Sequence, residues 1–98
     1  MSYGTGWAPP LTWGPEYELE GNGGGDRSPY TVSCESQSEA PSSYTIRVRY
    51  VTADGVKTVT EAAGEGTTSI TVPSGDGVGT DKISFQSHSV GQVIQYTW

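Results

Sequence analysis

The amino-acid sequence predicts an all-β protein: an antiparallel β-sandwich of about seven strands over residues 16–98, preceded by an extended arm over residues 1–15. Three observations carry this prediction. The chain has 98 residues, which is enough for one domain. Strong helix formers are scarce, whereas Thr, Val, Tyr and Ile dominate from Tyr30 onward. Short alternating segments recur with turn residues between them.

The first 15 residues differ in composition from the rest of the chain. Tyr3, Trp7 and Trp13 are spaced by glycine and proline, and Pro9-Pro10 disfavours a helix and favours an extended, polyproline-like path. The two tryptophans lie outside any strand pattern. We therefore expect each of them to cover an apolar surface, either that of its own sandwich or that of a neighbouring subunit or partner.

Three segments in the first half of the sandwich alternate apolar and polar residues, as half-buried strands do. They span residues 16–20, 30–34 and 44–52. Their predicted inward residues are Tyr17, Leu19, Tyr30, Val32, Cys34, Tyr44, Ile46, Val48 and Tyr50. Arg47 and Arg49 point to the opposite face. As a pair they could anchor a partner carboxylate, or they could offset Glu61 or Glu18.

Asp54-Gly55 predicts a hairpin between residues 44–52 and 56–61, because this dipeptide suits a type I′ turn. A two-residue loop would place Tyr50 opposite Val59, and a bulged loop would shift the register by one. The remaining predicted strands span residues 67–72, 81–88 and 92–98. Their predicted inward residues are Thr68, Ile70, Val72, Ile83, Phe85, Ile94, Tyr96 and Trp98.

Charge and composition exclude several functions. The net charge of −6 disfavours binding to nucleic acid or to an anionic membrane, since both need a basic surface. A single cysteine, Cys34, excludes an internal disulfide and a four-cysteine zinc site. Met1 to Gly4 do not read as a signal peptide. The Ser-, Thr- and Gly-rich, Lys-poor composition favours an extracellular or virion-associated protein over a cytoplasmic one.

Two stretches resemble known families. Tyr44–Tyr50, followed after a turn by Thr67–Val72, resembles the middle of an immunoglobulin-like or fibronectin type III-like module, which implies a β-sandwich. Ser33–Gly66 more faintly resembles the tendamistat-type amylase inhibitors. That family has two disulfides and inhibits through a Trp-Arg-Tyr turn, whereas the turn from Cys34 to Ser43 contains none of these three residues.

The sequence contains little that could support catalysis. A hydrolytic triad needs a nucleophile, a base and an orienting acid. The only histidine, His88, lies among polar strand neighbours, and Cys34 alternates with apolar residues as a small core residue does. Zinc needs several His or Cys ligands, and the Gly- and Asp-containing loops match no EF-hand. We therefore predict no enzymatic activity, no metal and no cofactor.

These observations predict a non-catalytic binding or assembly module that contacts a protein partner or itself. It would suit a structural component on the surface of a larger particle. The candidate binding residues are Tyr3, Trp7, Trp13, Arg47 and Arg49. One alternative is a small enzyme inhibitor that acts through the loop at 35–43 or at 74–81. Another is a carbohydrate-binding module, in which exposed Trp and Tyr rings stack on sugars.

Overall fold

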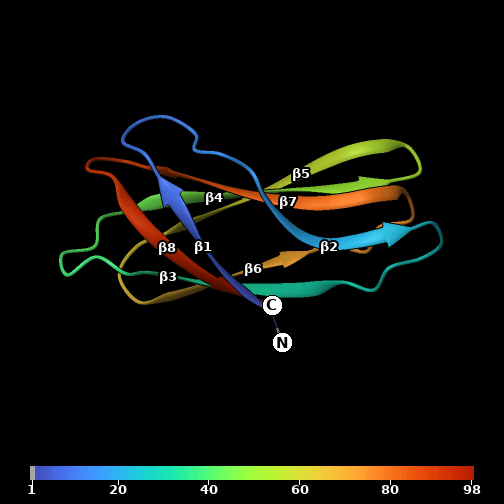
Figure 1. Cartoon of the computed structure of the whole chain (residues 1–98), viewed down its shortest axis with the longest axis horizontal. Helices are drawn as coiled ribbons and strands as arrows, with labels where there is room; N and C mark the ends of the chain where they lie inside the picture. The colour runs from blue at the N-terminus through green and yellow to red at the C-terminus, as the bar shows by residue number, and fades with distance from the viewer. Residues whose placement is uncertain (1) are drawn as a thin grey trace.

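A computed structural model describes residues 2–98, which form eight strands in two antiparallel sheets of four, without a helix. Sheet A has the order β1 (Tyr3–Ala8), β8 (Gln92–Thr97), β3 (Tyr30–Ser36) and β6 (Thr67–Val72). Sheet B has the order β2 (Tyr17–Gly23), β7 (Val78–Ser87), β4 (Tyr44–Thr52) and β5 (Gly55–Ala63). The two sheets form two layers (Figure 1). The all-β prediction is confirmed, with eight strands rather than about seven.

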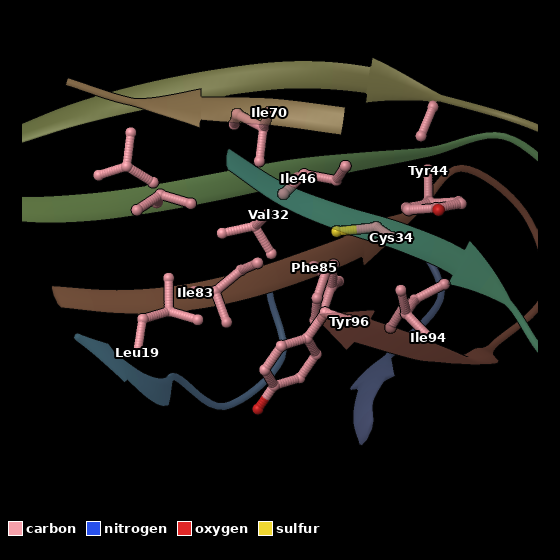
Figure 2. Packing of buried hydrophobic residues seen from close by; sticks show 14 residues of the cluster. Leu19, Val32, Cys34, Tyr44, Ile46, Ile70, Ile83, Phe85, Ile94 and Tyr96 are labelled. Atoms are coloured by element: carbon pink, nitrogen blue, oxygen red, sulfur yellow. The ribbon is translucent and has the colours of Figure 1, made fainter. Parts of the chain in front are cut away.

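One apolar core lies between the sheets, and both sheets contribute to it (Figure 2). The largest fully buried side chains are those of Tyr44, Phe85, Ile46, Ile70, Ile83 and Ile94. Phe85 contacts Tyr44 edge-on at 6.4 Å between ring centroids and Tyr96 at 5.8 Å. The inward faces predicted from period-two alternation are thus the buried ones, because successive side chains of a strand point to opposite faces.

The predicted extended N-terminal arm over residues 1–15 is not confirmed as a part separate from the sandwich, because Tyr3–Ala8 forms the edge strand β1 of sheet A. This strand pairs with β8 along its whole length, with Trp7 opposite Val93. Met1 lies outside the described residues. The residues of β1 that face the core are Gly4, Gly6 and Ala8.

Small inward residues are the physical reason that β1 joins the sandwich. A Cβ atom on Gly6 would lie 2.7 Å from the ring of Phe85, and one on Gly4 would lie 2.6 Å from the hydroxyl of Tyr96. Only glycine lets the backbone lie this close to the aromatic core. The sequence signal for this strand was the alternation of small and large residues. In an ordinary strand the large apolar residues face the core, whereas in β1 the small residues face the core and the large residues face outward.

Residues 9–14 carry the chain from sheet A to sheet B and run beside β7. The amide of Ser87 donates to the carbonyl of Pro9 at 3.0 Å, and its carbonyl accepts from the amide of Leu11 at 2.8 Å. Farther along, the amide of Gly14 donates to the carbonyl of Phe85 at 3.0 Å. This segment is therefore fixed to the sandwich by backbone hydrogen bonds.

The β4–β5 hairpin forms, but its predicted register is wrong. Tyr50 pairs with Lys57, and Thr52 pairs with Gly55, so the loop residues are Ala53 and Asp54 rather than Asp54 and Gly55. The Thr52 hydroxyl accepts from the amide of Asp54 at 3.2 Å and donates to the carbonyl of Gly55 at 2.8 Å. Gly55 has a φ of 119°, which favours glycine.

The hydroxyl of Tyr44 is the one buried side-chain polar atom in residues 2–98 that has no hydrogen-bond partner. We expect Tyr44→Phe to raise the free energy of unfolding by about 1 kcal/mol, since an unsatisfied buried polar group is costly. Urea unfolding measures this change. The matched control is Tyr17→Phe, which removes a 2.8 Å bond to the amide of Trp7. It should lower the same quantity by about 1 kcal/mol. Equal losses in both variants would contradict this account.

The fold should lose stability in alkali through its buried thiol. Burial raises the pKa of Cys34 from about 9 to about 12, so the native state retains a proton that the unfolded chain releases. The contribution of this thiol to the free energy of unfolding is therefore fully present below about pH 9. It falls by up to about 1.4 kcal/mol per pH unit as the pH rises toward 12. Unfolding curves between pH 8 and pH 10 test this. Cys34→Ala should flatten the decline, and an unchanged slope would count against it.

Candidate functional site

Four exposed apolar residues lie on neighbouring segments: the end of β1, the segment after it, the β7–β8 turn and the start of β8. We call them the Trp7 patch: Trp7 (44% exposed), Leu11 (74%), Val90 (63%) and Val93 (41%). The Trp7 ring packs on Gly91 so closely that a Cβ there would lie 2.4 Å from the ring. Pro10 lies 3.4 Å from the same point.

The other two members of the patch are brought together by Ser87. The carbonyl of Ser87 holds the amide of Leu11, and its hydroxyl donates to the carbonyl of Val90 in a short hydrogen bond. Ser87 itself is fully buried. Hydrogen bonds therefore fix the backbone beneath the patch, although its side chains are exposed to solvent.

Leu11 is the only non-glycine residue in residues 2–98 with a positive φ, at 61°. This conformation is unfavourable for a branched apolar residue. With 74% of its surface exposed, Leu11 also gains little from burial. Burial of the side chain therefore does not offset the cost of this backbone conformation, which the hydrogen bond from the Leu11 amide to Ser87 holds in place.

The backbone of Trp7 is fixed by Tyr17 from the other sheet. The amide of Trp7 donates to the Tyr17 hydroxyl at 2.8 Å, and the Tyr17 ring lies 6.1 Å from that of Tyr96. This bond satisfies the outward amide of the edge strand β1 at Trp7 and fixes the backbone from which the indole projects.

Tyr3 is 73% exposed and projects from the same outer face of β1 as Trp7. Four residues of strand separate their Cα atoms by about 13 Å. Between and beside them lie the polar residues Thr5, Gln95 and Thr97, at paired positions on β1 and β8. Tyr3 is thus on the surface that holds the Trp7 patch but is separate from it.

Trp13, Arg47 and Arg49 lie elsewhere, on the outer face of sheet B. The guanidinium of Arg47 stacks over the Trp13 ring at 4.1 Å and donates to the Ser84 hydroxyl at 3.2 Å. Desolvation lowers the pKa of Arg47, the nearby Arg49 adding to the effect. Trp13 therefore covers its own sandwich.

Arg49 pairs with an acid that the sequence did not indicate. Its Nε atom lies 3.7 Å from Glu16, and within residues 2–98 it forms no ion pair with Glu61 or Glu18. The five predicted binding residues therefore fall on two faces: Tyr3 and Trp7 on the outer face of sheet A, and Trp13, Arg47 and Arg49 on that of sheet B. Sequence reasoning missed Leu11, Val90 and Val93. For Val93 the signal was an apolar residue at an outward strand position.

The opposite end of the sandwich holds an open cleft of about 610 Å³, formed by the loops between strands. Asp26, Asp54 and Asp76 line it together with Arg27 and Lys57. Asp76 accepts a 2.7 Å bond from the amide of Ala53, so it holds the β4–β5 turn.

His88 and Cys34 are not arranged for covalent catalysis. His88 is exposed, and its ring nitrogens lie 3.0 Å from the Ser43 hydroxyl and 2.7 Å from that of Thr45. Cys34 is fully buried and unpaired, and its raised pKa keeps it a thiol at neutral pH. Within residues 2–98, no three His, Cys, Asp or Glu residues are grouped to hold a metal ion. Nor does that part of the chain contain a helix that could cross a membrane.

Comparison with known proteins finds no matching family model, no matching curated protein and no matching solved structure. The site must therefore be interpreted from its own geometry.

Proposed function

We propose that the protein is a non-catalytic binding or assembly module that contacts a protein partner through the Trp7 patch. The observation that carries this proposal is Leu11, whose backbone has an unfavourable positive φ and whose apolar side chain is exposed four residues after Trp7. Backbone strain at an exposed residue occurs often at binding sites. A large aromatic residue at the centre of an apolar group is the usual anchor of a protein interface.

The surrounding surface supports a protein partner of modest size. Four partly exposed apolar residues make a patch of the few hundred Å² that commonly marks a functional site on a monomer. A stable interface buries about 800 Å² on each side, so polar neighbours would contribute the rest. In this proposal the protein is a surface component of a larger particle, extracellular or virion-associated. Its resemblance to immunoglobulin-like modules stays a prediction.

The test compares immobilised chains as baits in an extract of the cells or particles that carry the protein. Leu11→Asn removes the apolar side chain and relieves the backbone, because Asn tolerates a positive φ. We expect it to lower retention of the partner by about tenfold or more. The matched control is Val78→Ser, which removes a side chain that is also 74% exposed but lies outside the patch. Equal retention by both variants would refute the proposal.

A carbohydrate-binding module is the second candidate, and the placement of Tyr3 favours it. Two outward aromatic residues of one strand, with Cα atoms about 13 Å apart and with hydroxyl and amide groups between them, suit stacking on a neutral glycan. Electrophoresis in gels that contain a neutral polysaccharide tests this. Tyr3→Ala should abolish retardation in the gel, whereas Leu11→Asn should leave it unchanged. The loop-inhibitor alternative has no such supporting observation.

A further inference from the structure

The strand β6 forms one edge of sheet A. The alternation of hydrogen-bonded pairs along the strands of this sheet shows which peptide groups of β6 are free. Ser2 and Trp98 exchange both backbone hydrogen bonds, at 2.8 and 2.9 Å. Exchanging and non-exchanging pairs alternate along antiparallel strands. Thr97 and Gln95 of β8 therefore direct their peptide groups to β3, where they face Ser33 and Glu35.

It follows that the alternate residues of β3 direct their peptide groups to β6. Val32 pairs with Ile70, and Cys34 pairs with Thr68. The peptide groups of Thr67, Ser69 and Thr71 consequently point away from the sheet. In residues 2–98 no other backbone or side-chain group hydrogen-bonds to them.

The other three edges are protected in ways that β6 is not. The edge strand β2 has Glu18, Glu20 and a register shift, and β5 has Lys57 and Glu61. On β1, the outward amide of Trp7 is already bonded to Tyr17. Charges, bulges and coverage are the usual means of preventing edge pairing. β6 reads TTSITV, with no charge, proline or register shift.

The free edge of β6 is complementary to itself. A twofold axis through Ser69 would place Ser69 opposite its copy and Thr67 opposite Thr71 of a second copy. Each of these three pairs could exchange two backbone hydrogen bonds. The side chains of all three residues bear hydroxyls on the outer face, where Thr and Ser pairs across strands are favourable.

The distribution of charged residues also favours contact between copies at the β6 edge. Two chains of net charge −6 repel each other, so a contact between copies is favoured where charges are few. On β6 and its neighbour β3, the only charged residue is Glu35, whose carboxylate accepts from the Thr67 hydroxyl at 3.2 Å. A twofold axis through Ser69 puts the two Glu35 residues at opposite ends of the contact.

We propose that the edge of β6 pairs with β6 of a second copy about this twofold axis, joining two A sheets into one continuous eight-stranded sheet. This contact is separate from the Trp7 patch and does not depend on the proposed function. A contact limited mainly to one strand is smaller than the roughly 800 Å² per partner of a stable dimer. The dimer should therefore dissociate on dilution.

Light scattering from micromolar to millimolar protein tests the proposal. The wild-type mass should rise toward that of a dimer, whereas Ser69→Lys should stay monomeric because two lysines would face each other at the axis. The matched control is Thr60→Lys on the exposed edge strand β5, which should associate as the wild type does. A wild type that stays monomeric throughout would overturn the proposal. So would a Ser69→Lys chain that still dimerises.

Cross-linking reports the register directly. Exchanging residues of antiparallel strands have Cα atoms about 5.5 Å apart, within the range that a disulfide spans. Oxidised Ser69→Cys should therefore form a covalent dimer, while Thr60→Cys should not at the same concentration. The native Cys34 is buried and should not react. Equal cross-linking of the two variants would overturn the assigned register.

Discussion

Replacing Asp81 with asparagine is expected to lower the free energy of unfolding by about 3–5 kcal/mol, the usual effect of removing one partner of a buried ion pair. The Asp81 side chain is 3% exposed and that of Arg27 is 11% exposed, with 3.2 Å between the carboxylate and Nε. Asparagine preserves the size of the side chain but leaves the guanidinium without its counter-charge.

Asp81 joins three parts of the chain that are distant in sequence. The same carboxylate oxygen that contacts Arg27 accepts a 2.8 Å bond from the Tyr30 hydroxyl. The other oxygen accepts a 3.1 Å bond from the amide of Val51. Arg27 also donates to the carbonyl of Pro73 at 2.8 Å. Loss of the carboxylate therefore loosens the loops around the cleft as well as β7.

Chemical denaturation of wild type and Asp81→Asn measures the effect. The control is Glu16→Gln, which breaks the exposed ion pair with Arg49. Exposed pairs contribute little, so the control should change the free energy of unfolding by less than about 1 kcal/mol. If Asp81→Asn cost no more than this control, the buried pair would not stabilise the loop end as argued.

Gly6→Val is expected to lower the free energy of unfolding by about 3 kcal/mol, at the upper end of ordinary overpacking. A Cβ atom at this position would lie 2.7 Å from Phe85 and 2.8 Å from Tyr17, so β1 must move away from the core. Hydrogen exchange should report faster opening of β1. Thr5→Val, at the exposed neighbouring position, is the control and should retain wild-type protection. Equal protection in both variants would contradict the close packing of β1.

Period-two alternation predicted the inward faces of six strands, because each has apolar residues at its buried positions. It missed β1, where Gly4 and Gly6 face the core and Trp7 faces solvent. The turn signal of Asp54-Gly55 gave the wrong β4–β5 register, since the hydroxyl of Thr52 and the carboxylate of Asp76 fix that turn one residue earlier. Interactions with a distant loop leave no local pattern in the sequence.

The candidate site was predictable only in part. The exposure of Trp7 and Tyr3 follows from large residues on the outward side of β1, once that strand is recognised. The positive φ of Leu11 has no local signal, because leucine does not favour it. Trp13 resembled Trp7 in sequence but stacks under Arg47, and only the path of residues 9–14 along β7 determines this difference.

The most direct test of the account is fluorine NMR of a chain labelled with fluorotryptophan, recorded before and after addition of the protein fraction that the wild-type bait retains. The three tryptophans give three resonances, assigned by single Trp→Phe variants. The account predicts that the Trp7 resonance shifts on binding, while those of Trp13 and Trp98 do not. A shift of Trp13 without one of Trp7, or no shift at all, would contradict the claim that the Trp7 patch is the contact surface.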